Sequence, residues 1–176
     1  FLQLALGYSP SQAGLVMLPA GISLALAMPL AGRLADRLPT RPLVITGCLM
    51  LTASLALMVP VTAATPYGII VALAILGRIG LGTIHPALTL GSTRGMQPAE
   101  LPQAMTMSSF VRQLGGAMGI ASMGIFLDWR LAAHGVEGGL QGAEQAAGVL
   151  AAFSESFASL AAICVLACLA AWFMEN

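Results

Sequence analysis

Long apolar stretches alternate with short polar segments along the chain. The apolar stretches predict helices over residues 11–32, 42–61, 66–90, 103–127 and 153–174. Each is close to the ~20 residues that an α-helix needs to cross the hydrocarbon core of a bilayer. Residues 1–6 are apolar as well and read as the last turns of a preceding helix, so we expect the chain to be a fragment. The pattern predicts an all-α membrane protein, a single transmembrane region over residues 1–176 with five full spans.

The arginines are divided unequally between the two sides of the predicted bundle. Four lie in the short connections on one side, and one lies in the polar, Gly-rich segment 128–152 on the other. The four are Arg33, Arg37, Arg41 and Arg94, and the single one is Arg130. Because arginine-rich connections stay in the cytoplasm, segment 128–152 is predicted to be the long extramembrane loop outside. The C-terminus is then cytoplasmic.

Composition and charge exclude several classes of function. The chain is 58% hydrophobic and only 8% charged, its net charge is zero and it contains no lysine, so it lacks a basic surface for nucleic acid. It has no His-Glu-x-x-His pattern, no serine nucleophile motif and no acid pair inside a span. Its three cysteines lie in apolar stretches, where thiols act as small core residues. We therefore expect no enzyme, no cofactor and no metal site.

The third apolar stretch carries two polar side chains near its middle. Arg78 lies about twelve residues from either end, and an arginine at that depth costs at least ~2.5 kcal/mol. Helical phase places Arg78, Gly82 and His85 on one face. Gly82 is interpreted as leaving space between the other two and as a helix-packing residue. Arg78 and His85 therefore either line a cavity or belong to a helix junction, with the arginine bound to backbone carbonyls.

The fourth apolar stretch has one face of small and polar residues. That face holds Ser108, Ser109, Arg112, Gly115, Gly116 and Gly119, with Gln113 beside it. The spacing Gly115-x-x-x-Gly119 permits close approach of two helices, which predicts a packing seam, either static or moving during transport. Arg112 either extends to the headgroups or faces protein, and together with Gln113 it is a candidate cavity-lining residue.

The connection after the first span, Gly32-Arg33-Leu34-Ala35-Asp36-Arg37-Leu38-Pro39-Thr40-Arg41, places an acid between basic residues. It resembles the signature loop of the major facilitator superfamily. That signature is Gly-x-x-x-Asp-Arg/Lys-x-Gly-Arg/Lys-Arg/Lys. Its matches here are Gly32, Asp36, Arg37 and Arg41, while Pro39 and Thr40 depart from the pattern. The resemblance implies a conformational latch in which the aspartate contacts a helix end and the arginines. The alternative is a basic loop that only sets topology.

Three further motifs resemble the closing helices of fourteen-helix EmrB/QacA-type drug:proton antiporters. They are Gly7-Tyr8-Ser9-x-x-Gln12-Ala13-Gly14 with Leu18-Pro19, Gly80-x-Gly82 with Pro86-Ala87-Leu88-Thr89, and Phe110-x-Arg112-Gln113-Leu114-Gly115-Gly116-Ala117-x-Gly119. The motifs occur in order and cover most of the chain. The resemblance implies the C-terminal half of a major facilitator helix bundle, in which substrate binds between this half and the missing one.

This resemblance implies a proton-coupled efflux transporter in a bacterial inner membrane. It would export small amphipathic molecules, and the acids that couple protons would lie in the missing N-terminal half. The implied partners are the substrate, protons, the lipid bilayer, the missing half of the same chain and a periplasmic adaptor protein. Two alternatives stay open: an exporter of lipids, siderophores or metabolites with the same fold, and a membrane scaffold without transport activity.

Overall fold

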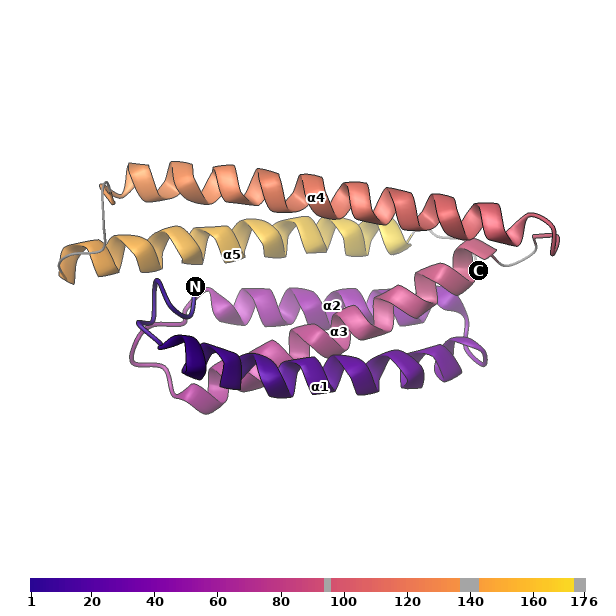
Figure 1. The fold of residues 1–176 in the computed structure, drawn as a ribbon, viewed down its shortest axis with the longest axis horizontal. Coiled ribbons are helices and arrows are strands. Elements are labelled where there is room, and N and C mark those ends of the chain that lie inside the picture. Colours follow the sequence, from indigo (N-terminus) through magenta and orange to yellow (C-terminus); the bar gives the residue numbers. More distant parts are fainter. Residues whose placement is uncertain (94–95, 137–142, 173–176) are drawn as a thin grey trace.

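Five helices make up the part of the chain that the structure describes. The computed structural model describes residues 1–93, 96–136 and 143–172. The helices are α1 (Pro10–Ala35), α2 (Thr40–Met58), α3 (Tyr67–Thr93), α4 (Leu101–Ala133) and α5 (Ala143–Trp172) (Figure 1). All five are long and apolar enough to cross a membrane. The predicted all-α fold with five spans is therefore confirmed, and the chain is a multi-pass membrane protein.

Local sequence signals explain where the helices begin. Ser9 caps α1 through a capping box: its hydroxyl accepts from the Gln12 amide at 3.3 Å, and its own amide donates to the Gln12 side chain at 3.0 Å. Pro10 stands at the first helical position, where a missing amide costs nothing. Pro102 occupies the same kind of position in α4. Before Ser9, residues 2–6 form turns, and Gly7 adopts a positive φ of 67°.

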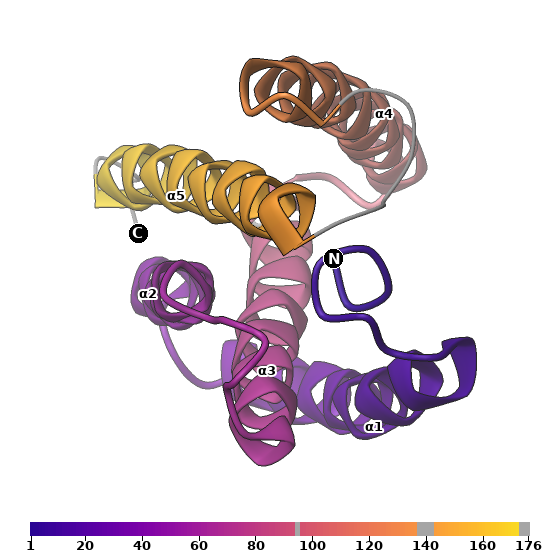
Figure 2. The same ribbon diagram turned by 90° about the vertical axis from the view of Figure 1, so that its left-hand side faces the viewer.

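Helix α3 is the centre of the packing, because it contacts α1 on one side and α2 on another, and α2 in turn packs against α5 (Figure 2). Glycines make these contacts close. A Cβ built on Gly80 would lie 2.7 Å from the Gly47 carbonyl oxygen of α2, and one on Gly82 would lie 2.8 Å from the Ala27 Cβ of α1. The Ser54 hydroxyl of α2 donates to the Leu73 carbonyl at 2.7 Å. Small residues and interhelical hydrogen bonds are how helices associate in lipid.

Helix α4 stands apart from this core. All of its residues are described, and none of them is buried. It lies beside α5, away from α1 and α2 (Figures 1 and 2). Its last turns pack Leu127 and Leu131 against Val149 and Phe153 of α5. Most side chains in the rest of α4 are exposed, and the others are half-buried.

The predicted long loop 128–152 is shorter in the structure. Helix α4 continues to Ala133 and α5 begins at Ala143, so both ends of the predicted loop are helical. The placement of this segment outside the membrane stays a prediction, because hydropathy reports depth in the membrane, whereas a helix continues wherever its backbone hydrogen bonds continue. At ~1.5 Å per residue the 33 residues of α4 span ~50 Å, well beyond a ~30 Å hydrocarbon core. Residues 137–142, and Arg94 in the α3–α4 connection, lie outside the described residues.

Candidate functional site

The predicted latch residues lie at the arginine-rich end of the bundle, which carries the α1–α2 and α3–α4 connections. Asp36 is the C-cap residue of α1, and its backbone amide donates to the Gly32 carbonyl at 3.2 Å. The side chains of Asp36 and Arg37 are exposed and line a shallow cavity of about 430 Å³ with Arg33 and two leucines. Among the described residues Asp36 forms no ion pair. Its carboxylate is thus accessible at the surface of this end.

Arg41, the fourth predicted latch residue, lies elsewhere. It belongs to the first turn of α2, and its guanidinium carbon sits 5.0 Å from the ring centroid of Trp172 at the end of α5. A cation over an indole ring at this distance is attracted by the π-electrons. Arg41 therefore contributes to the α2–α5 contact, separately from Asp36 and Arg37.

Arg78 lies near the middle of α3, eleven residues from Tyr67 and fifteen from Thr93. At ~1.5 Å per residue these separations are ~17 and ~22 Å. Its side chain is exposed, and among the described residues it makes no hydrogen bond or ion pair. A guanidinium has five donors, so one exposed at the middle of a membrane span is available to a ligand, to water or to another helix.

His85 is half-buried two turns along α3 from Arg78. Its backbone carbonyl accepts from the Thr89 hydroxyl at 3.0 Å. Gly82, between the two polar residues in sequence, is buried against Ala27 and Leu24 of α1. This contact agrees with the prediction of Gly82 as a helix-packing residue, while its role as space between the two polar side chains stays a prediction.

The small and polar face of α4 is open in the structure. The Arg112 guanidinium donates to the Ser109 hydroxyl at 3.4 Å, and both Arg112 and Gln113 are exposed. A Cβ built on Gly115, Gly116 or Gly119 would meet no atom within 4 Å. No described helix occupies the predicted seam, so the packing role of these glycines stays a prediction.

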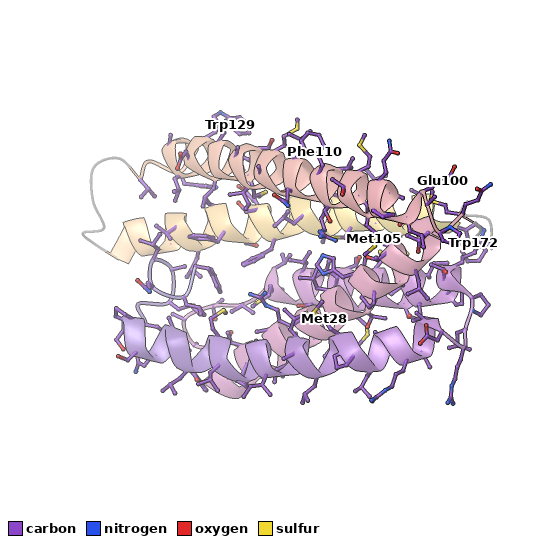
Figure 3. All side chains as sticks on the ribbon, turned by 45° about the vertical axis from the view of Figure 1, so that its right-hand side comes forward. Met28, Glu100, Met105, Phe110, Trp129 and Trp172 are labelled. Carbon is purple, nitrogen blue, oxygen red and sulfur yellow. The ribbon has the colours of Figure 1, made fainter. Side chains whose placement is uncertain are left out.

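A groove borders the beginning of α4. Its volume is about 900 Å³, and it is mainly apolar, with Glu100 at its edge. Met96, Gln103, Thr106, Met107 and Phe110 are among its lining residues. Figure 3 labels Glu100 and Phe110 along this part of α4. Gln103, Thr106, Met107 and Phe110 recur at i, i+3, i+4 and i+7, so the groove lies on a different side of α4 from Arg112 and the glycines.

The opposite end of the bundle holds a charged cluster that the sequence analysis missed. The Arg130 guanidinium of α4 pairs with both carboxylate oxygens of Glu155 in α5. His134 Nε2 lies 3.3 Å from Glu155 Oε2, and the Arg130 guanidinium carbon is 5.4 Å from the ring centroid of Trp129. Trp129 itself projects from the outer side of α4 (Figure 3). The sequence signal that could have found this cluster is a basic and an acidic residue near the facing ends of two consecutive, antiparallel helices.

No group of three or more metal-ligating side chains occurs in the described part of the chain. The candidate site is therefore a set of exposed polar side chains on α3 and α4, together with the latch residues at one end and the charged cluster at the other.

Comparisons with known proteins find relatives of this chain among antibiotic resistance proteins and multidrug transporters. The chain is 32% identical over 133 residues to a methylenomycin A resistance protein of Streptomyces coelicolor, covering 73% of this chain and 28% of that protein. It is 30% identical over 130 residues to a multidrug transporter of Bacillus subtilis, covering 74% and 24%. A puromycin resistance protein of Streptomyces alboniger is 27% identical over 176 residues, covering 98% and 35%.

The chain thus spans about a quarter to a third of the length of these relatives. The family model described as Major Facilitator Superfamily matches residues 1–176. From the five apolar helices, the relatives and this match over the whole chain, we conclude that the chain belongs to the major facilitator superfamily.

Proposed function

We propose that the chain is the C-terminal half of a proton-coupled transporter that exports small amphipathic molecules across a bacterial inner membrane. The observation that carries the proposal is Arg78, a cation exposed near the middle of a membrane-spanning helix. A lipid-facing arginine at this depth is costly, so an aqueous cavity between two helix bundles is its natural environment. Relatives named as multidrug and antibiotic resistance proteins support drug export.

The missing N-terminal half supplies the other wall of this cavity and the carboxylates for proton coupling. The centres of the five spans contain no Asp or Glu, so the proton acceptors lie outside them. The open face of α4, with Gly115 and Gly119, is suited to a second bundle that approaches closely and moves during alternating access. The arginine-rich end is cytoplasmic in this arrangement, as is the C-terminus. A periplasmic adaptor protein completes the proposed partners.

Asp36 and Arg37 act as the latch of one transport state. Both side chains are exposed beside the shallow cavity at the end of α1, where they are accessible to a partner helix. A surface ion pair is worth only ~0–1 kcal/mol. Such a contact is readily broken and remade as the halves rock, whereas a basic loop that only sets topology would not need the carboxylate.

Efflux from cells that express the complete transporter tests the proposal. Cells are loaded with ethidium, a lipophilic cation, or with fluorescein, an anion, and efflux is followed with and without a protonophore. We expect protonophore-sensitive efflux of at least one dye. The control is a transporter truncated before α4, at equal membrane abundance. Efflux of neither dye above that control would contradict proton-coupled export.

A further inference from the structure

The face of α3 that carries Arg78 is not used for packing within the described residues. Gly77 and Gly80 turn toward α2, where built Cβ atoms would lie 2.8 Å from the Ser54 hydroxyl oxygen and 2.7 Å from the Gly47 carbonyl oxygen. Gly82 turns toward Ala27 of α1. Arg78 takes part in neither the α2 contact nor the α1 contact, and its side chain is exposed. Its guanidinium therefore lies on the side of α3 that α1 and α2 leave open.

Two further nitrogen-bearing side chains lie at comparable depth. Counted from the arginine-rich end, His85 is eight residues inside α3 and Arg112 is eleven residues inside α4. At ~1.5 Å per residue they are ~12 and ~17 Å deep, against ~22 Å for Arg78. Both arginines are exposed. The two arginines thus lie within about 5 Å of each other in depth, and His85 lies nearer the arginine-rich end.

No acid balances these cations in the same layer. The sequence contains no Asp or Glu in residues 1–35, 37–99, 101–127 or 156–172. Asp36 and Glu100 cap helices at the arginine-rich end, and Glu155 already pairs with Arg130 at the other. This half of the cavity wall therefore carries positive charge without an acid of its own, and in a region of low dielectric such a wall attracts an anion and repels a cation.

From this charge distribution we infer the substrate class, an inference that rests on the proposed transport function. We propose that Arg78 binds the acidic group of an amphipathic organic anion, so that the transporter exports organic acids in preference to lipophilic cations. A guanidinium matches a carboxylate or sulfonate because two parallel N–H donors meet two oxygens. The apolar residues beside it, such as Leu81 and Ala74, suit the hydrocarbon part of such a molecule.

The test uses two dyes with the same xanthene ring system and opposite charge. Everted membrane vesicles containing the complete transporter receive an acid-inside pH gradient, and uptake of fluorescein, the anion, is compared with uptake of rhodamine 6G, the cation. The variants are Arg78→Gln and Arg78→Lys. The matched control is Ile69→Gln, which places the same amide on an exposed position at the other end of α3. Membrane abundance of every variant is measured.

We expect Arg78→Gln to lower fluorescein uptake at least about tenfold, as loss of a charged hydrogen bond does. Rhodamine 6G uptake should stay constant or rise, and Arg78→Lys and Ile69→Gln should keep the preference for the anion. Two results would overturn the inference and leave the proposed export standing. One is protonophore-sensitive uptake of rhodamine 6G without uptake of fluorescein, and the other is an equal decrease in the uptake of both dyes by Arg78→Gln. Uptake of neither dye by the unaltered transporter, together with absent efflux from cells, would refute both.

Discussion

Replacement of Gly80 by alanine should weaken the contact between α2 and α3. The new Cβ would lie 2.7 Å from the Gly47 carbonyl oxygen, 2.9 Å from the Leu51 amide nitrogen and 3.1 Å from the Met50 Cβ. Two of these three atoms belong to the backbone of α2, which cannot move aside by changing a rotamer. To reach an ordinary contact distance of 3.4 Å, the two helices must separate locally by about 0.7 Å.

The expected cost follows from two opposing effects. Overpacking of this kind typically costs ~1–3 kcal/mol. Alanine is a better helix former than glycine, which offsets ~1 kcal/mol. The net destabilisation is then on the order of 1 kcal/mol and at most about 2 kcal/mol, which corresponds to a decrease of roughly 2–8 °C in the unfolding midpoint of a chain this long.

The matched control is Gly68→Ala in the same helix. A Cβ built on Gly68 meets no atom within 4 Å, so this variant gains helix propensity without overpacking. Both proteins are solubilised in the same detergent, heated in steps and assayed for the remaining monodisperse fraction. We expect the midpoint of Gly80→Ala to fall and that of Gly68→Ala to stay equal or rise. Equal midpoints in the two variants would show that the α2–α3 contact is looser than described.

Two other changes test the two ends of the bundle. Asp36→Asn removes the exposed carboxylate of the proposed latch; we expect slower efflux at unchanged membrane abundance, and an unaffected rate would leave the α1–α2 connection as a basic loop that sets topology. Glu155→Gln leaves the Arg130 guanidinium without its acid; we expect easier proteolysis near the α4–α5 connection, with no further effect when Arg130→Gln is added. Additive effects of these two changes would mean that the ion pair does not join α4 to α5.

The helices were predictable because length and hydropathy decide whether a segment enters a bilayer. Their ends were less so: the Ala-rich turns after Asp128 continue α4 on backbone hydrogen bonds that no hydropathy pattern reports. The depth of Arg78 followed directly from its place in the sequence, since the helical rise is fixed.

Contacts between helices were harder to predict, because they depend on how two helices are rotated about their axes. Helical phase places Gly82 on one face with Arg78 and His85, but it does not say that α1 is the helix that packs against Gly82. The pairing of Arg130 with Glu155 depends on the same kind of rotation. The sequence also could not show that Arg41 lies apart from Asp36 and Arg37. Its partner Trp172 is more than a hundred residues away along the chain.

The absence of buried residues in α4 has a consequence for biosynthesis. Helix α4 is the least apolar of the five membrane-spanning helices, it carries Arg112, and its own half of the protein covers little of it. A segment with these properties enters the bilayer with a small free-energy gain when it leaves the translocon alone. Its stable residence in the membrane then depends on helices synthesised earlier. Truncations that remove those helices should be recognised by membrane proteases first at α4.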